Sequence, residues 1–501
     1  MSRIAARYHL QAYIPQRHSR LRAGSRACLV AALVSAHPHA VRQYYRERVF
    51  YPHGGHADAF HSPPRRRPIR AMRRPRSATN FGLCCIALAV GLVLVWMIAP
   101  GHIAGAASII PYAPLIPCLG IVAVIAVTEW LFPRLRSASE PLYAGPALRP
   151  INIARVAVRL LGLGATFALV GFAYWLLPEY HGDFYRPYWQ FLRSIAPVAI
   201  LVPVYFLWAD SRGRETRDEY LAFGSLLCNR LQSADGPLIK RHALGWTVKA
   251  FFLPLMTVYL SLELRALYGA LQSVSLHTMP LYQVFYHLSY ATDLLFCVVG
   301  YSATLRLFDS QIRSVEPSVA GWMVALICYQ PFYSVVGRLY LQYDDATYWD
   351  NWLQLWPATR AVWAALIILL ASIYAICTVA FGLRFSNLTH RGIITSGPYR
   401  FSKHPAYLAK NLSWWLISVP FVSELGWSAA LRNCCLLILV NLVYYARART
   451  EERHLSRDPT YVAYALWINE HGLLRGLAGV LPFMRYQVRI GAEVDSSAPA
   501  Q

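Results

Sequence analysis

The chain has 501 residues, of which 56% are hydrophobic and only 15% carry charge. Soluble domains carry charge on about a quarter of their residues, so this composition excludes a soluble globular protein and indicates a protein of the membrane. The net charge of +23 is unevenly placed: residues 1–78 hold sixteen arginines and two acids, or +14, which leaves +9 for the rest. The basic balance therefore reflects an arginine-rich tail and basic loops, and no nucleic-acid partner is expected.

Residues 1–78 are rich in arginine, histidine and proline, which predicts a disordered cytoplasmic tail. Its apolar stretch at 27–36 is too short to cross about 30 Å of hydrocarbon, although it could serve as a weak signal-peptide core. Met72, followed by Arg73 and Arg74, also reads like a natural N-terminus, so translation starting there is an alternative. Residues 491–501 are predicted to form a second disordered tail.

From Phe81 onward, ten apolar stretches have a length suited to helices that cross the membrane. They lie at about 81–99, 109–132, 156–177, 191–208, 246–266, 283–304, 320–340, 361–382, 405–422 and 428–446. The predicted fold class is therefore all-α, a polytopic membrane protein of about ten transmembrane helices.

The loops between these stretches alternate in charge. The segments 133–155, 209–245, 305–319 and 383–404 are basic, whereas those at 100–108, 178–190, 267–282, 341–360 and 423–427 hold almost no lysine or arginine. Basic loops stay on the cytoplasmic side of a membrane, so both termini and the segment 383–404 are predicted to be cytoplasmic.

The first polar cluster lies in the segment 387–407. Gly397-Pro398 indicates a turn, and Pro405 stands where the next helix would begin. A helix N-terminus beside Tyr399 and His404 suits a polar or anionic ligand, because its first N–H groups lack partners within the helix. A basic loop at the membrane surface is the alternative interpretation.

The second cluster is Arg447 and Glu451, which are four residues apart and share one face of a helix. A surface salt bridge at the end of a helix is the alternative. The stretch from Pro405 to Tyr445 has 41 residues, enough for two short spans of about 18 residues each with a tight turn. Such a hairpin would return Arg447 and Glu451 to the membrane face where His404 lies.

At these residues the chain resembles the isoprenylcysteine carboxyl methyltransferase family and, more distantly, phospholipid N-methyltransferases. The resemblance covers about residues 360–470. Its motifs are Gly397-Pro-Tyr399-Arg-Phe-Ser-Lys403-His404-Pro405-Ala-Tyr407, then Arg447-Ala-Arg-Thr-Glu451-Glu452, then Tyr461-Val-Ala-Tyr464.

The resemblance implies S-adenosyl-L-methionine as cofactor. It assigns the cofactor contacts to His390, Arg391, Gly392, Ile393, Ile394, Tyr399, His404, Pro405, Ala406, Tyr407 and Glu451. Arg447 matches the arginine that binds the substrate carboxylate, and Arg447 and Glu451 are the expected catalytic pair. The family often has histidine where Arg391 stands, with His390 next to it.

These features together predict a methyltransferase core at 356–490 and, at 79–355, a membrane region of about seven helices whose role is open. The expected function is methyl transfer from S-adenosyl-L-methionine to a carboxyl group of an isoprenoid-cysteine or other lipid-anchored acceptor, at the cytoplasmic face of the membrane. Methylation of a phospholipid amine is the alternative within enzymes. A transporter or scaffold is the alternative of another class, supported only by Asp293 near mid-span. No metal site is expected.

Overall fold

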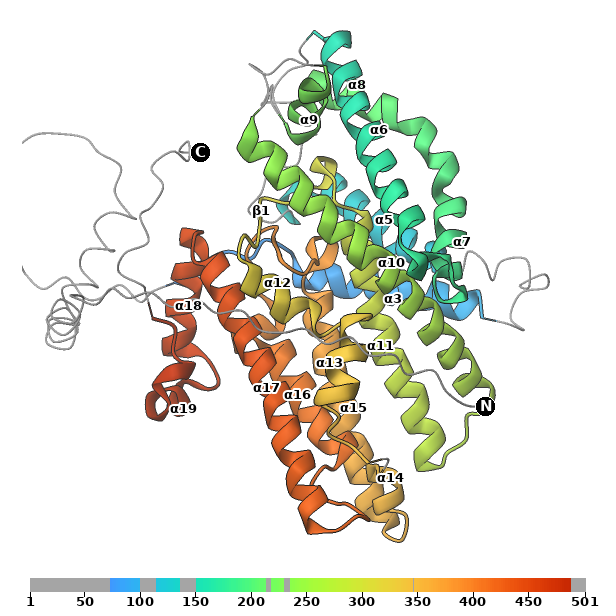
Figure 1. The fold of residues 1–501 in the computed structure, drawn as a ribbon, viewed down its shortest axis with the longest axis vertical. Helices are drawn as coiled ribbons and strands as arrows, with labels where there is room; N and C mark the ends of the chain where they lie inside the picture. The colour runs from blue at the N-terminus through green and yellow to red at the C-terminus, as the bar shows by residue number, and fades with distance from the viewer. Residues whose placement is uncertain are drawn as a thin grey trace, which may run out of the picture. The chain divides into compact units, whose positions relative to one another are not determined.

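The computed structural model describes residues 73–99, 114–135, 150–212, 218–228, 235–345 and 347–487. Of the expected tails at 1–78 and 491–501, only residues 73–78 lie within these ranges. Nearly all regular structure in the described residues is helical (Figure 1). The helices are α3 (Phe81–Met97), α5 (Leu115–Leu131), α6 (Ile153–Leu176), α7 (Arg186–Ile195), α8 (Leu201–Arg212), α9 (Glu219–Leu227), α10 (Gly236–Gln272), α11 (Thr278–Ser302), α12 (Val319–Leu326), α13 (Phe332–Tyr340), α14 (Trp349–Trp352), α15 (Pro357–Val379), α16 (Pro405–Ser418), α17 (Trp427–Leu455), α18 (Pro459–His471) and α19 (Arg475–Val480). Two short strands, β1 (Ser314–Val315) and β2 (Thr389–His390), complete them.

Five helical stretches of the described chain are long and apolar enough to cross a membrane: Ile153–Leu176, Asp183–Arg212, Gly236–Gln272, Pro357–Val379 and Trp427–Leu455. Several of them turn large apolar side chains outward, among them Phe172, Trp175, Val362, Leu439 and Leu442. Exposed apolar faces of this size are unfavourable in water and suit contact with lipid. The protein is thus an all-α membrane protein, and the number of ten spans stays a prediction.

Two of the expected spans differ from single membrane-crossing helices. The stretch 320–340 forms α12 and α13, of 8 and 9 residues, each only about 12–14 Å long. Pro331 lies between them and cannot donate the hydrogen bond that a continuous helix needs. In the stretch 405–422, α16 ends at Ser418 after 14 residues, a length of about 21 Å.

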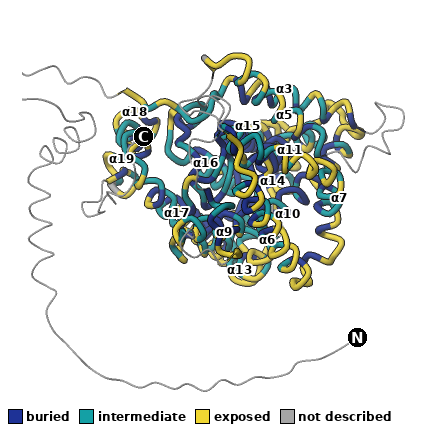
Figure 2. The backbone as a smooth tube through the Cα atoms, turned by 90° about the horizontal axis from the view of Figure 1, so that it is seen from above, coloured by how far each residue is buried: buried dark blue, intermediate teal, exposed yellow. Residues whose placement is uncertain are grey.

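The main hydrophobic core is shared by the two halves of the chain. Residues of α3, α10 and α11 pack in one cluster with Val379 at the end of α15 and with Leu383 and Leu388 from the segment after it. Figure 2 shows buried backbone gathering around α11 and α15. The border expected near residue 355 is therefore not a break in the packing.

The strands β1 and β2 join the first half of the chain to the segment after α15. They are antiparallel, with Ser314 opposite His390 and Val315 opposite Thr389. The N–H of Glu316 continues the pairing by donating to the carbonyl of Leu388 at 2.8 Å. This contact places residues 314–316 against the start of the segment 387–407, where the first polar cluster was predicted.

The residues before α3 pack against that same segment from another side. The N–H of Ala78 donates to the carbonyl of Ile393 at 2.8 Å, and the N–H of Thr395 donates to Ser77 Oγ at 3.2 Å. Gly392 has a φ of +117°, and a Cβ atom there would lie 2.7 Å from Ala78 Cβ. Only glycine meets both the backbone conformation and the close approach without strain.

We predict that Gly392→Ala lowers the melting temperature in detergent, because the added methyl group meets Ala78 and the backbone must adopt an unfavourable φ. Gly164→Ala in α6 is the matched control, since no described atom lies within 4 Å of the Cβ atom it would add. Gly164→Ala should leave the melting temperature unchanged or slightly higher. Equal melting temperatures for the two variants would contradict this account of Gly392.

Candidate active site

A cavity lies between the segment after α15, the first turns of α16, the last turns of α17, and the region from β1 to α12. Its wall includes most of the residues that the sequence predicted: His390, Arg391, Gly392, Ile393, Ile394, Tyr399, His404, Ala406, Tyr407, Arg447 and Glu451. Pro405 is buried at the first position of α16 and does not line the cavity. The structure therefore gathers the two polar clusters in one place.

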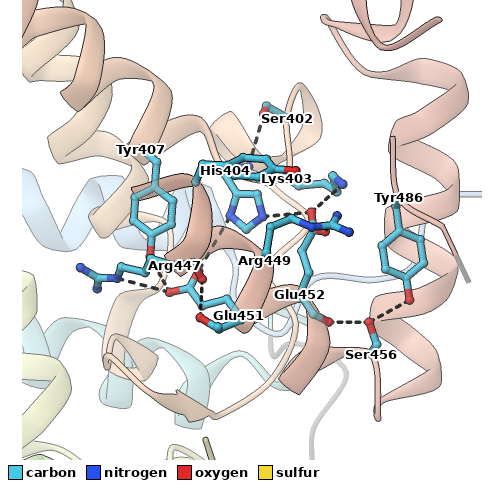
Figure 3. A network of polar contacts seen from close by, with 12 residues as sticks. Ser402, Lys403, His404, Tyr407, Arg447, Arg449, Glu451, Glu452, Ser456 and Tyr486 are labelled. Atoms are coloured by element: carbon cyan, nitrogen blue, oxygen red, sulfur yellow. Dashed lines mark hydrogen bonds and ion pairs between the residues drawn. The ribbon is translucent and has the colours of Figure 1, made fainter. Parts of the chain in front are cut away.

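The α16–α17 hairpin brings the clusters into contact, as its length predicted. His404 Nε2 lies 3.2 Å from Glu452 Oε1, and its Nδ1 lies 3.8 Å from Glu451 Oε2. The hydroxyl of Tyr407 donates to Glu451 Oε1. The rings of His404 and Tyr407 stack with centroids 5.6 Å apart, so both side chains face the end of α17 (Figure 3).

The carboxylate of Glu452 links the end of α17 to the residues just before α16. Lys403 Nζ lies 2.6 Å from its Oε1, and Arg449 Nη1 lies 2.7 Å from its Oε2, in addition to the contact with His404. The Glu452 side chain is only 6% exposed. A buried carboxylate is tolerated when cations and hydrogen bonds compensate its lost hydration. Glu452 is not among the residues predicted for the site, although the Glu-Glu pair in the motif was the available signal.

Glu451 differs from its neighbour because it faces the cavity. Its side chain is 33% exposed, and it contacts Tyr407 and the guanidinium of Arg447, whose Nε lies 3.9 Å from Oε1. Its carboxylate is therefore less enclosed than that of Glu452. The Glu451 carboxylate can therefore contact a bound molecule, whereas the Glu452 carboxylate is engaged in contacts within the protein.

Arg447 is buried in the cavity wall and is fixed in orientation. It donates to the side-chain oxygen of Asn387. The guanidinium carbon lies 5.3 Å from the ring centre of Tyr407, 5.6 Å from Tyr329 and 5.9 Å from Tyr444. Aromatic rings at these distances stabilise a cation that has lost water.

The guanidinium of Arg391 donates its hydrogen bonds to backbone carbonyl oxygens. Its donors contact the carbonyl oxygens of Ser310 at 2.6 Å, Gly300 and Phe385 at 2.7 Å, and Leu383 at 2.8 Å. Burial, together with the neighbouring Arg384, lowers the pKa of Arg391 to about 9. The carbonyl oxygens compensate the buried charge. A ligand contact at this position would therefore come from the backbone.

His390 is turned toward the start of α18. Its Nε2 lies 3.2 Å from Asp458 Oδ2, and Asp458 also accepts from the N–H of Thr460 at 2.7 Å. Burial alone would raise the pKa of Asp458, but the contacts with His390 and Thr460 outweigh it and lower this pKa. Spacing along the sequence could not reveal this pairing.

Helix α18 also fixes the turn that holds Tyr399. The hydroxyl of Tyr464 donates to the carbonyl oxygens of Tyr399 at 2.7 Å and Ser402 at 3.1 Å. Tyr461 and Tyr464, the aromatic pair of the third motif, both line the cavity. The third motif therefore supports the turn around Tyr399 and forms part of the cavity wall.

The buried Asp293 receives hydrogen bonds from two side chains of α15. The hydroxyl of Tyr374 donates to its Oδ2 at 3.0 Å, and Thr378 donates to its Oδ1. Tyr374 and Thr378 belong to the cavity wall, as does Lys410, whose Nζ lies 5.0 Å from the Tyr374 ring centre. Lys410 is not among the residues predicted for the site, although a lysine inside an expected span was a signal.

The fold and the site together define a helical membrane protein with a polar cavity near the ends of two apolar helices. Residues 360–457, about a fifth of the chain, match the model of the isoprenylcysteine carboxyl methyltransferase (ICMT) family, and this match supports methyl transfer by a membrane protein. No curated protein and no solved structure matches the chain. The residues before 360 lie outside the family match.

We predict that Glu452→Ala lowers the folding stability much more than Glu451→Ala does. Glu452→Ala leaves Lys403, His404 and Arg449 without their shared carboxylate, which should cost about 3–5 kcal/mol of folding stability. Glu451→Ala removes a more exposed group and should cost less than about 1 kcal/mol. Denaturant unfolding in detergent micelles measures both values. A similar loss of stability in the two variants would refute the distinction drawn between the adjacent glutamates.

Proposed function

We propose that the protein transfers the methyl group of S-adenosyl-L-methionine to a carboxyl group of an isoprenoid-cysteine or another lipid-anchored acceptor. The family match supports methyl transfer by a membrane protein. The choice of a carboxyl group depends mainly on one observation, the oriented guanidinium of Arg447 in the cavity wall.

The cavity suits the proposed cofactor, which carries hydroxyl, amino, carboxylate and adenine groups. Within the described residues, the hydroxyl groups of Thr389 and Tyr461 are buried without a hydrogen-bond partner, and both residues line the cavity. Such groups favour a polar ligand. The residues that would hold it are the backbone of 390–394 with Tyr399, His404, Ala406, Tyr407 and Glu451.

When bound, S-adenosyl-L-methionine supplies a methyl group activated by a positively charged sulfur. The protein needs to form no covalent bond for such a displacement, so its task is to orient the two reactants and to exclude water. Glu451 would place a negative charge beside the cationic end of the cofactor. Tyr407 fixes the position of Glu451 through its hydrogen bond.

Arg447 is the cation of the cavity wall that best fits an acceptor carboxylate, since Arg384 is paired with Asp309 at 2.9 Å and Lys410 offers a point charge without a planar fork. The guanidinium of Arg391 donates to carbonyl oxygens. Lys403 Nζ pairs with Glu452 Oε1 at 2.6 Å. Arg447 instead has Glu451 Oε1 at 3.9 Å from its Nε, beyond hydrogen-bond distance. A planar guanidinium can bind a carboxylate through two parallel hydrogen bonds. The same positive charge would repel a protonated amine, which disfavours a phospholipid amine as acceptor.

We predict that Arg447→Ala keeps its affinity for S-adenosyl-L-methionine and lowers methyl transfer by about 10- to 150-fold, the equivalent of about 1.5–3 kcal/mol of charge-assisted hydrogen bonding. Arg447→Lys should be a poor substitute, since a point charge lacks the planar fork. His404→Ala and Glu451→Ala should weaken cofactor binding itself. Isothermal titration gives the affinities, and labelled methyl groups give the transfer rates.

Arg432→Ala is the control for this series, because Arg432 lies at the opposite end of α17 and outside the cavity wall. It should retain both binding and transfer. Near wild-type transfer by Arg447→Ala would rule out the carboxylate proposal and favour an amine acceptor.

The proposed topology places this site on the cytoplasmic face, where the cofactor is available, with the lipid part of the acceptor in the bilayer. The basis is the alternation of basic and non-basic loops. We predict that tags at both termini and in loop 209–245 are cytoplasmic, and that a tag in loop 341–360 is external. Protease protection in sealed membranes measures this. An external tag in segment 383–404 would contradict the site proposal.

A further inference from the structure

The cavity wall includes residues that precede the family match. They are Glu316, Gly321, Ala325 and Tyr329, which come from the region between β1 and α13. Glu316 follows β1 directly, and its N–H donates to the carbonyl of Leu388 at 2.8 Å. The strand pairing therefore places an acid beside residues 389–394, the segment that would hold the cofactor.

The two oxygens of the Glu316 carboxyl group have different surroundings. Oε1 accepts from the N–H of Ser318 at 2.9 Å and from its hydroxyl. Oε2 lies 3.8 Å from His454 Nδ1, which is beyond hydrogen-bond distance, while His454 Nε2 is 2.8 Å from Ser314 Oγ. One oxygen is thus fixed by the protein, and the second has no close donor among these contacts.

The burial of Glu316 makes this second oxygen significant. The residue is only 3% exposed, and a Cβ atom at Gly321 would lie 2.4 Å from Glu316 Cγ, so the neighbouring backbone is closely packed around the side chain. A buried carboxylate is unfavourable unless each oxygen receives hydrogen bonds. The orientation of Glu316 is therefore set, and one of its acceptors suits a donor group in the cavity.

We propose that Glu316 binds the cofactor, with Oε2 accepting a hydrogen bond from a donor group of S-adenosyl-L-methionine. The donor is either a ribose hydroxyl group or the amino group of the methionine end. This inference depends on the proposed function. It assigns a cofactor contact to a residue about 45 positions before the family match begins.

The test compares ligands and variants together, with the purified full-length protein in detergent. Isothermal titration measures the affinity for S-adenosyl-L-methionine and for analogues that lack the 2′-hydroxyl, the 3′-hydroxyl or the amino group. In the wild type, loss of the recognised donor should weaken binding by about tenfold or more, as for a hydrogen bond to a charged group. In Glu316→Ala, the same loss should cost almost nothing further, and the analogue that shows this behaviour identifies the donor.

Two further variants separate binding from folding. Ser318→Ala removes the hydroxyl that donates to Oε1, leaves the backbone N–H of residue 318 in place and keeps the carboxylate, so it should retain the tenfold difference between ligands. Glu316→Gln keeps the shape of the side chain and should retain only a small part of that difference, and it serves if Glu316→Ala does not fold.

The outcomes distinguish the two proposals. Equal weakening of all four ligands in the Glu316 variants would show a structural role and overturn the inference. A wild-type protein that binds none of the ligands would instead refute the proposed function. An analogue effect that is as large in the variants as in the wild type would also overturn the assignment of Glu316.

Discussion

The carboxylate of Glu452 at the end of α17 is held by Lys403 and His404 at the start of α16, and this contact determines the geometry of the site. It joins the open ends of the α16–α17 hairpin. The turn of this hairpin, near Gly426, lies at the opposite ends of the two helices. Because Glu452 is fixed, Glu451 one residue earlier is directed to Tyr407, and Arg447 one turn earlier is directed to the cavity. A buried charge that is compensated on several sides permits few alternative arrangements, which suits a site whose task is to position reactants.

The parts of the chain outside the family match contribute to the same site. Ser77 and Ala78 contact the backbone of Thr395 and Ile393, and β1 pairs with β2 on the other side. The segment 389–394 is therefore held from two sides by residues that precede residue 360. The first half of the chain shares its core with the second, so it shapes the cavity as well as providing membrane helices.

Sequence reasoning could predict the features that depend on local patterns. The apolar runs indicated membrane helices, and the length of the hairpin predicted that His404 and Glu451 would meet. The expected single span at 320–340 was wrong because the apolar pattern continues across Pro331, although the proline itself was an available signal for the break. Sequence reasoning could not separate Arg391, which holds carbonyl oxygens, from Arg447, which faces the cavity, because both are arginines within polar motifs. The contacts of Glu316 and His390 join segments far apart in the chain, and spacing along the sequence carries no record of such pairs.

The central claim is that the methyl group is transferred to a carboxyl oxygen. The most direct measurement uses membranes that contain the protein and S-adenosyl-L-methionine labelled in its methyl group, followed by base treatment of the labelled lipid-anchored fraction. A methyl ester is cleaved by base and releases the label as volatile methanol, which is the result that this account predicts. Label that resists base and remains on a phospholipid amine would contradict it.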